Sequence, residues 1–342
     1  MITVKKLFFA FCITISTSAF SQQPTIKILE SGKKVSIRGL SVVNNHVIWA
    51  SGSGGSVARS TNGGNSFTWI KVSGYEKSDF RDIEAFDSNK AIIMGITSPA
   101  VILKTKDGGK SWKKVFEDTT RGAFFDAMAF SVNNYGILVG DPINHKVFVA
   151  YTRNGGDTWE TPSTQGKNIG VEAKEGEAFF ASSGTNVAMI GNTNHEIMVS
   201  GGKASRLFTG VSNDSLPIMQ GKESTGANSV AIYDGKKIVI VGGDFTKDTI
   251  SNNNCVLSDL DLWNPMHYKI PKTSPHGYRS CVIFLSKKKL LTCGTSGVDI
   301  SNDGGMNWEL IAKDGFHVCQ KAKKGKAVFL AGNGKIAKLV YP

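Results

Sequence analysis

The sequence predicts an all-β fold: a seven-bladed β-propeller of four-stranded antiparallel blades, closed by the N-terminal strand. Three observations predict it. A turn motif recurs at nearly constant spacing. Glycine is abundant, with 38 of 342 residues, and proline is scarce, with 9, as many tight turns between short strands require. The last unit is one strand short, and a strand near the N-terminus can complete it.

The recurring motif reads Ser/Thr-x-Asp/Asn-Gly-Gly-x-x-Trp. Three copies fit it, with their key residues at Thr105, Asp107, Gly109 and Trp112, at Thr152, Asn154, Gly156 and Trp159, and at Ser301, Asp303, Gly305 and Trp308. A stretched copy runs from Ser60 to Trp69. The Asp or Asn side chain is expected to bond nearby N–H groups, glycine to supply a positive φ, and tryptophan to pack in the blade. We therefore interpret these residues as structural and not catalytic.

The spacing of the motif indicates the architecture. The copies begin at Ser60, Thr105, Thr152 and Ser301, so the intervals are 45, 47 and 149 residues. Degenerate copies at Ser212-Asn213-Asp214 and at Ser258-Asp259 before Trp263 divide the long interval into 60, 46 and 43 residues. A period of ~40–50 residues with four strands per unit is typical of a propeller.

The periodicity places the seven blades. Six are expected at about 36–70, 79–117, 122–162, 175–214, 226–265 and 277–311. Residues 315–341 supply three strands of the seventh, and Thr25 to Leu29 supplies the fourth. This closure joins the two ends of the chain in one blade and removes an open sheet edge.

The four motifs resemble the BNR/Asp-box repeats of sialidases and many other propellers. Their setting is similar to the photosystem II stability/assembly factor-like family (WD40/YVTN/BNR-like), including its bacterial members. The segments that carry this resemblance are 47–52, 140–143, 176–185, 242–244 and 277–280. It covers nearly the whole mature chain, although the degenerate fourth and fifth units depart from the pattern. It implies a protein that helps to assemble a larger complex.

A polar group recurs where each inner strand is expected to begin. These starts are 37–39, 81–83, 125–127, 176–178, 228–230, 278–280 and 316–318. Inner strands begin at one mouth of the channel, where the loops between second and third strands also open. The expected binding set is Arg38, Arg81, Asp82, Asp126, Asp141, Glu177, Asp244, Tyr278 and Arg279. The alternative is that these groups only pair with one another and hydrate the channel.

Lysines gather in turns expected on the opposite, bottom face. They are Lys236, Lys237, Lys287, Lys288, Lys289, Lys321, Lys323, Lys324 and Lys326. Such lysines protect sheet edges and keep a protein soluble, or they contact acidic surfaces.

Residues 1–21 have the pattern of a signal peptide, and 22–342 form a single propeller domain. A basic pair, Lys5 and Lys6, precedes an apolar run at 7–15, and small residues precede a cleavage site near Ser21/Gln22. A lipoprotein anchored at Cys12 is the alternative. No later segment approaches the ~20 apolar residues of a transmembrane helix. We expect a periplasmic or secreted protein with no nucleic-acid partner. Without the leader, the net charge falls from +12 to +10.

Four cysteines remain in the mature chain: Cys255, Cys281, Cys293 and Cys319. Cys281 and Cys293 face each other across a predicted hairpin, so a disulfide is one possibility. Four buried free thiols are the favoured alternative. No CxxC occurs, so neither a redox motif nor a zinc site is indicated. A cation bound by oxygen ligands at the channel mouth is an alternative, but no loop shows a calcium motif, so we expect no metal.

These patterns favour a non-enzymatic binding or assembly module, with no cofactor and no catalytic residue, for a protein partner or a glycan-like ligand. One alternative is a sialidase-like glycoside hydrolase, with Asp126 and Glu177 as its carboxylate pair. The three arginines that hold a sialidase substrate would then be Arg38, Arg81 and Arg279. A weaker alternative is an oxidoreductase, but no cofactor motif supports it.

Overall fold

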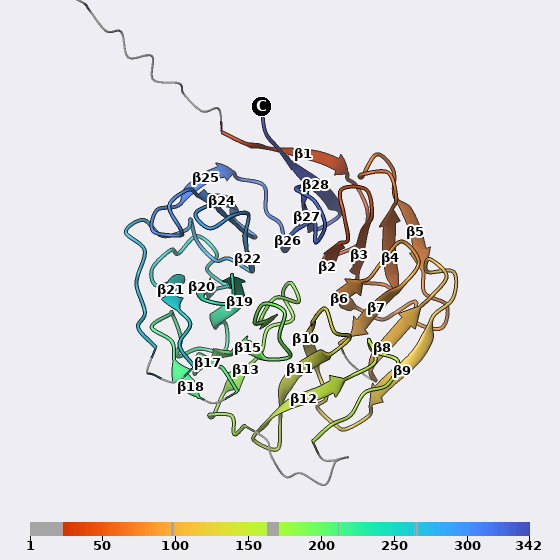
Figure 1. The fold of residues 1–342 in the computed structure, drawn as a ribbon, viewed down its shortest axis with the longest axis horizontal. Helices are drawn as coiled ribbons and strands as arrows, with labels where there is room; N and C mark the ends of the chain where they lie inside the picture. The colour runs from red at the N-terminus through yellow and green to blue at the C-terminus, as the bar shows by residue number, and fades with distance from the viewer. Residues whose placement is uncertain (1–22, 97–98, 163–170, 211, 263, 265) are drawn as a thin grey trace, which may run out of the picture.

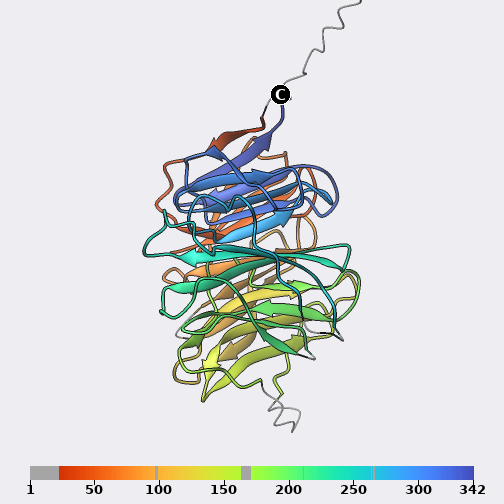
Figure 2. The same ribbon diagram turned by 90° about the vertical axis from the view of Figure 1, so that its left-hand side faces the viewer.

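The computed structural model describes residues 23–342 apart from 97–98, 163–170, 211, 263 and 265. Seven antiparallel sheets surround a central axis as the blades of a propeller, which confirms the predicted fold (Figure 1). From the side the molecule is a disc whose strands run across its thickness (Figure 2). The described part of the chain contains no helix long and apolar enough to cross a membrane. The expected signal peptide lies outside the described residues.

Four blades have four regular strands each. Blade one contains β2 (Ile37–Val42), β3 (Ile48–Gly52), β4 (Ser56–Ser60) and β5 (Thr68–Lys71). Blade two contains β6 (Phe80–Ala85), β7 (Ala91–Gly95), β8 (Ala100–Thr105) and β9 (Lys113–Asp118). Blade six contains β22 (Cys281–Phe284), β23 (Leu290–Gly294), β24 (Gly297–Ser301) and β25 (Glu309–Ala312). Blade seven contains β26 (Val318–Lys321), β27 (Val328–Gly332), β28 (Lys335–Val340) and β1 (Thr25–Glu30).

The other three blades are less regular. Blade three contains β10 (Phe125–Phe130), β11 (Gly136–Ile143) and β12 (Lys146–Thr152), and its fourth position is marked only by the bridge between Tyr151 and Glu160. Blade four contains β14 (Val187–Met189), β15 (Glu196–Val199), β17 (Arg206–Phe208) and β18 (Asn213–Ser215). Blade five contains β19 (Thr225–Tyr233), β20 (Lys237–Asp244) and β21 (Cys255–Asp259), to which β13 (Glu177–Ala178) and β16 (Gly201–Gly202) are added.

The N-terminal strand closes the ring as predicted. Strand β1 pairs antiparallel with β28, from Thr25 opposite Val340 to Glu30 opposite Ile336. Both ends of the described chain therefore lie in blade seven (Figure 1). This pairing covers the edge of β28, which would otherwise expose unpaired backbone groups.

The four motif copies form one hydrogen-bonded turn. In each, the second glycine donates its N–H to the Ser or Thr hydroxyl oxygen at 2.8–3.0 Å, and that hydroxyl donates to the Asp or Asn side chain at 2.9–3.0 Å. The first glycine donates to a carbonyl of the first hairpin turn in the same blade, as from Gly304 to Lys288 at 2.7 Å. The turn thus joins the outer half of each blade to its inner half.

The second glycine of each turn also packs against the preceding blade. At Gly109, φ is 86°, and a Cβ atom would lie 2.8 Å from the Cδ1 of Ile70. At Gly305, φ is 96°, and a Cβ atom would lie 2.7 Å from the Cδ2 of Leu257. The positive φ disfavours any other residue, and a Cβ atom would also displace a side chain of the preceding blade, so the motif contributes to blade packing as well as to the turn.

One predicted strand is wrong. The inner strand of blade four was expected at 176–178, but the inner strand is β14, about ten residues later. Residues 177–178 instead form β13, which pairs with β16. The reason is that the following segment first bonds to other blades, through Ser183 to Ser280 and through Thr185 to Ser229, and joins its own blade only afterwards.

All four described cysteines are buried free thiols. Cys281 and Cys293 are opposite each other in register, as the predicted hairpin requires. The Sγ atom of Cys281 also lies 3.7 Å from the Sγ of Cys319 in blade seven. These three thiols belong to the apolar core between blades six and seven.

Candidate binding site at the channel mouth

A cavity of about 420 Å³ opens at the mouth where the inner strands begin. Four residues of the expected set line it, namely Arg38, Arg81, Asp141 and Tyr278. His317 also lines the cavity, from the inner-strand start at 316–318, which contributes no residue to the expected set. The remaining lining residues are Phe124, Ala178, Phe179, Phe180, Ala181, Ser182, Phe245, Thr295 and His317. The site therefore combines two guanidinium groups with an aromatic wall.

A plug, residues 180–186, lies in the channel and forms the floor of this cavity. Ser183 donates to the carbonyl of Ser280 at 2.6 Å, and Thr185 donates to the hydroxyl of Ser229 at 2.7 Å. On the other side, Gly184 packs against the carboxyl of Asp82, where a Cβ atom would lie 2.3 Å from the Asp82 Cγ. The plug thus contacts blades two, five and six.

Arg38 is the cation at the centre of the site. Its Nη1 donates to the carbonyl of Ser182 at 3.3 Å, and among the described residues no carboxylate lies within ion-pair distance of it. Burial, and then the charge of Arg81, lower the pKa of Arg38. A guanidinium remains protonated under such conditions because its pKa is normally above 12. Arg38 therefore presents a positive charge that lacks a counter-ion.

Arg81 and His317 complete the polar side of the cavity. Arg81 pairs with Asp79 at 2.8 Å and lies over the ring of Phe124. Burial, followed by the charges of Arg38 and Arg81, lowers the pKa of His317 to about 3. The imidazole is therefore neutral at pH 7 and can accept or donate a hydrogen bond without adding charge.

Aromatic rings line the opposite side of the cavity. Phe245 makes edge contacts with Phe180, at 5.8 Å between ring centroids, and with Tyr278, at 6.3 Å. Phe245 remains 47% exposed, which is unusual for a phenylalanine held by two other rings. The hydroxyl of Tyr278 donates to Asn228 at 2.8 Å, so this ring is fixed in place.

Two aspartates of the expected set lie in the channel wall beside the cavity. Asp82 accepts the N–H groups of Ile83 and of Met128, both at 2.7 Å, and so connects blades two and three. Burial raises its pKa to about 8. Asp126 is fully buried, and burial, followed by the charge of Asp141, raises its pKa well above the usual range. With a pKa of about 8, the Asp82 carboxyl is mostly protonated at pH 7.

Glu177 and Asp244 do not line the cavity. Glu177 forms a buried ion pair with Arg206, whose Nε lies 2.9 Å from Oε1, and it also accepts the hydroxyl of Ser200 and the N–H of Lys174. Asp244 is used in its own turn, where it accepts the N–H and hydroxyl of Thr246. The carboxylate pair considered for a glycosidase, Asp126 and Glu177, is therefore not presented in this cavity.

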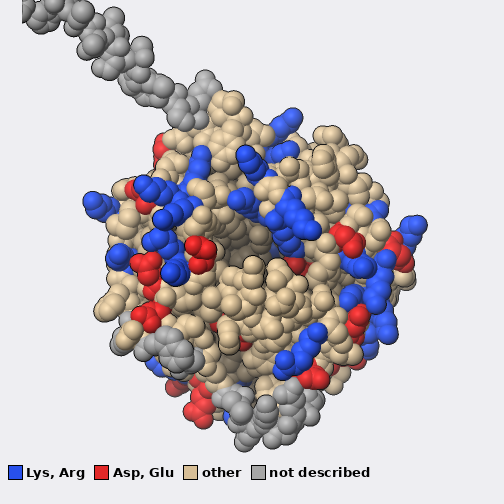
Figure 3. All heavy atoms as spheres, in the orientation of Figure 1, with Lys and Arg blue, Asp and Glu red and all other residues tan. Residues whose placement is uncertain are grey.

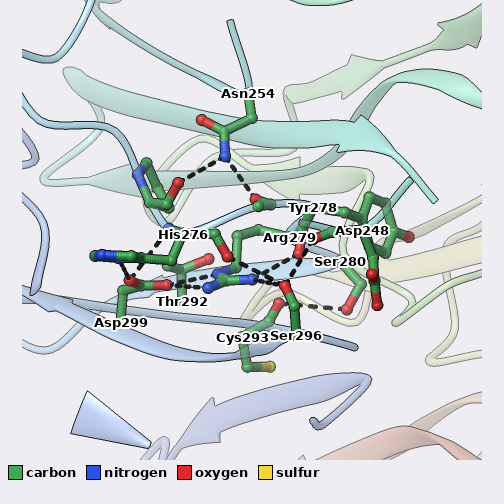
Figure 4. Close-up of polar contacts among 12 residues, drawn as sticks. Asp248, Asn254, His276, Tyr278, Arg279, Ser280, Thr292, Cys293, Ser296 and Asp299 are labelled. Atoms are coloured by element: carbon green, nitrogen blue, oxygen red, sulfur yellow. Dashed lines mark hydrogen bonds and ion pairs between the residues drawn. The ribbon is translucent and has the colours of Figure 1, made fainter. Parts of the chain in front are cut away.

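Arg279 is also held in a buried ion pair. Its Nε lies 2.6 Å from Oδ2 of Asp299, and the other oxygen of Asp299 lies 2.6 Å from Nδ1 of His276 (Figure 4). Nη1 of Arg279 donates to the carbonyl of Tyr278 and to Ser296. The three-arginine cluster expected for a sialidase is therefore reduced to Arg38 and Arg81 in the cavity.

Sequence reasoning missed the partners Asp299 and Arg206 and the aromatic wall. Asp299 did carry a signal, since an acid within the apolar strand at 297–301 requires a buried partner. Phe245 and Phe180 gave no such signal in the sequence, because they lie far apart in the chain and their contact joins a loop to the plug.

Lysine and arginine side chains border the central hollow on the face shown in Figure 3.

Among the residues that the structure describes, no group of three or more His, Cys, Asp and Glu side chains is placed to hold a metal ion. The mouth thus presents the guanidinium groups of Arg38 and Arg81 beside aromatic rings.

No protein-family model matches the sequence, and no curated protein matches it. Solved structures do match. A structure described as YCF48 bound to D1 peptide is 14% identical, covers 96% of this chain and 100% of its own, and has a TM-score of 0.64. The chain shares the fold of YCF48. YCF48 from Cyanidioschyzon merolae is 17% identical, with a TM-score of 0.61 over 92% of this chain and 98% of its own. The Neurospora crassa Pan2 WD40 domain is 12% identical, with a TM-score of 0.56 over 90% of each chain. At these identities the likeness concerns the fold.

Proposed function

We propose that this chain is an exported, non-enzymatic binding module that helps to assemble a protein complex by holding an anionic segment of a partner protein at the channel mouth. The observation that carries the proposal is Arg38, a largely buried guanidinium beside Arg81 with no carboxylate partner among the described residues. A buried charge is unfavourable unless it is paired. A carboxylate of the partner supplies that pair.

The rest of the cavity suits a peptide. Its volume of about 420 Å³ falls in the ~300–1,000 Å³ range of ligand pockets. The exposed ring of Phe245 offers an apolar contact beside the two arginines, and aromatic and arginine side chains dominate the energetics of protein interfaces. Because the plug closes the floor, the segment enters from the mouth and ends or turns there.

Two further observations support the proposal. One protein with this fold, YCF48, is described with a bound D1 peptide, so a propeller of this type holds a peptide. The pattern of residues 1–21 supports export to the periplasm or exterior, where the partner would be met.

Affinity capture with Arg38→Ala and Arg81→Ala variants tests the proposal. The mature chain is immobilised, an extract of the exported proteins is passed over it, and bound proteins are identified by mass spectrometry. Arg153→Ala, an exposed arginine in a turn far from the mouth, is the matched control. Loss of the same captured protein in both mouth variants, with retention in the control, supports the proposal. Equal capture by all variants contradicts it.

A further inference from the structure

A second concave surface, the blade five–six groove, lies between blades five and six and has a volume of about 310 Å³. It is formed by the first residues of β20, the last residues of β21 and β22, and the turns that follow them. Phe245, which follows β20, and Tyr278, which precedes β22, line the mouth cavity, whereas the groove lies at the opposite ends of these two strands. The groove therefore lies on the bottom face, away from the mouth.

The floor of the groove is apolar. Ile238, Val239 and Leu257 of blade five are almost fully buried, and Phe284 and Met306 of blade six are partly exposed beside them. Its volume is near the lower limit of ~300 Å³ for ligand pockets. The floor is therefore large enough for one apolar side chain rather than for a large cofactor.

The rim of the groove is basic. Four lysines line it, Lys237, Lys269, Lys287 and Lys288, against two aspartates, Asp259 and Asp303.

Both aspartates already have partners within the protein. Asp259 pairs with Lys237 at 3.2 Å, and Asp303 accepts the N–H groups of Met306 and Asn307 in its own turn. Hydrogen bonds from Asn307 and Ser301, opposed by burial, lower the pKa of Asp303, so it remains charged while bound within the turn.

Three other lysines of the bottom face are held by contacts within the protein. Lys323 donates to Ser41, to Glu84 and to the carbonyl of Ala85, and so fastens blade seven to blades one and two. Lys321 donates to the carbonyl of Leu285, and Lys289 lies over the ring of Tyr341. Within the described residues, Lys269, Lys287 and Lys288 have no ion pair. These three lysines therefore place unpaired positive charges around the apolar floor of the groove.

We propose that the blade five–six groove is a second binding site that takes an acidic peptide segment with one large apolar side chain between its carboxylates. The apolar side chain rests on the floor, and flanking Glu or Asp residues face Lys269, Lys287 and Lys288. An apolar anchor surrounded by complementary charge is the usual arrangement of a specific protein contact. The floor is recessed behind the lysines, which favours an inserted side chain over a membrane surface.

Fluorescence anisotropy with short peptides tests this site independently of the mouth. The probe is a fluorescein-labelled, C-terminally amidated Glu-Glu-Phe-Glu-Glu peptide. We expect the double variant Lys287→Glu/Lys288→Glu to weaken binding roughly tenfold or more, because like charges across an interface are strongly unfavourable. The matched control Lys110→Glu/Lys113→Glu makes the same charge change on exposed residues of blade two and should change affinity less than twofold.

Replacing the central phenylalanine of the probe with alanine should weaken binding to the parent protein roughly tenfold, since the buried ring provides much of the free energy. Both changes leave the apolar core untouched, because only the peptide or exposed lysines are altered.

Equal affinities for the groove variant and its control overturn the proposal. So does a loss of binding in Arg38→Ala, which assigns the peptide to the mouth. Lysine-dependent binding to phosphatidylglycerol vesicles without any peptide binding also overturns it, in favour of a lipid surface.

Discussion

Glu177→Gln is the substitution that best separates structure from binding in this protein. Glu177 is 5% exposed and accepts hydrogen bonds from Arg206, Ser200 and Lys174, so its carboxylate has no free site for a ligand. Glutamine keeps the size but removes the charge. Arg206, also 5% exposed, then loses its counter-ion in the protein interior.

The expected loss follows from this burial. Removing one partner of a buried ion pair lowers the free energy of unfolding by about 3–5 kcal/mol. Since m-values in urea are about 1–3 kcal/mol per molar and increase with size, the midpoint of urea unfolding should fall by about 1–2 M. Peptide binding below the transition should remain, because Glu177 does not line the mouth cavity.

Arg38→Ala should behave in the opposite way. It removes an unpaired charge and a single 3.3 Å hydrogen bond, so the free energy of unfolding should change by less than about 1 kcal/mol while capture of the partner is lost. The urea midpoint and the capture of the partner are both measured for Glu177→Gln and for Arg38→Ala, and each variant should change only one of the two quantities. An unchanged midpoint with lost capture in Glu177→Gln would refute the assignment of this residue to the framework.

Three other outcomes are expected. Trp159→Ala should destabilise by about 3–5 kcal/mol, since its ring packs against Phe116 and Phe130, and equal melting of parent and variant would contradict this. Deletion of residues 22–31 should sharply lower the melting temperature, because β28 loses its pairing with β1 at the outer edge of blade seven; a truncated chain as stable as the parent would exclude a role for the closure. The pKa of Asp82 is raised to about 8, so between about pH 4 and 8 the folded state holds one more proton than the unfolded state. The free energy of unfolding therefore falls as the pH rises through that window, by up to about 1.4 kcal/mol per pH unit. Urea unfolding at pH 5, 6 and 7 should show a shallower slope for Asp82→Asn, and an identical slope would show that Asp82 is ionised in the folded protein.

The regular part of the fold was predictable because its signals are local. The motif turns at 105–112, 152–159 and 301–308 use side chains within a few residues of each other, so their spacing is visible in the sequence. The closure by β1 followed from counting strands in the last unit. The placement of Arg38, Arg81 and Tyr278 at one mouth followed from the same alignment of inner strands.

The remainder was not predictable because it depends on contacts between distant segments. The run at 176–185 has the apolar character of an inner strand, and only two of these residues pair in a sheet. Whether such a run joins a blade or enters the channel depends on the groups it meets there, such as Ser229 and Ser280. Likewise, Arg279 and Arg38 both stand at the start of an inner strand in the sequence, and only the structure shows that Arg279 is paired with Asp299.

The unusual length of the fourth unit indicates where the mouth cavity forms. The interval from Thr152 to Ser212 is 60 residues, whereas the other adjacent intervals are 43–47. In a closed ring of blades, extra residues must leave the repeat, and insertions in repeat proteins commonly gather on the binding face. Here the interval contains the plug, which forms the cavity floor and receives the hydrogen bond of Arg38 at Ser182. The bottom face keeps the regular turns that hold the blades together. The departure from the repeat supplies the plug beneath Arg38, at the site where we propose that an anionic segment binds.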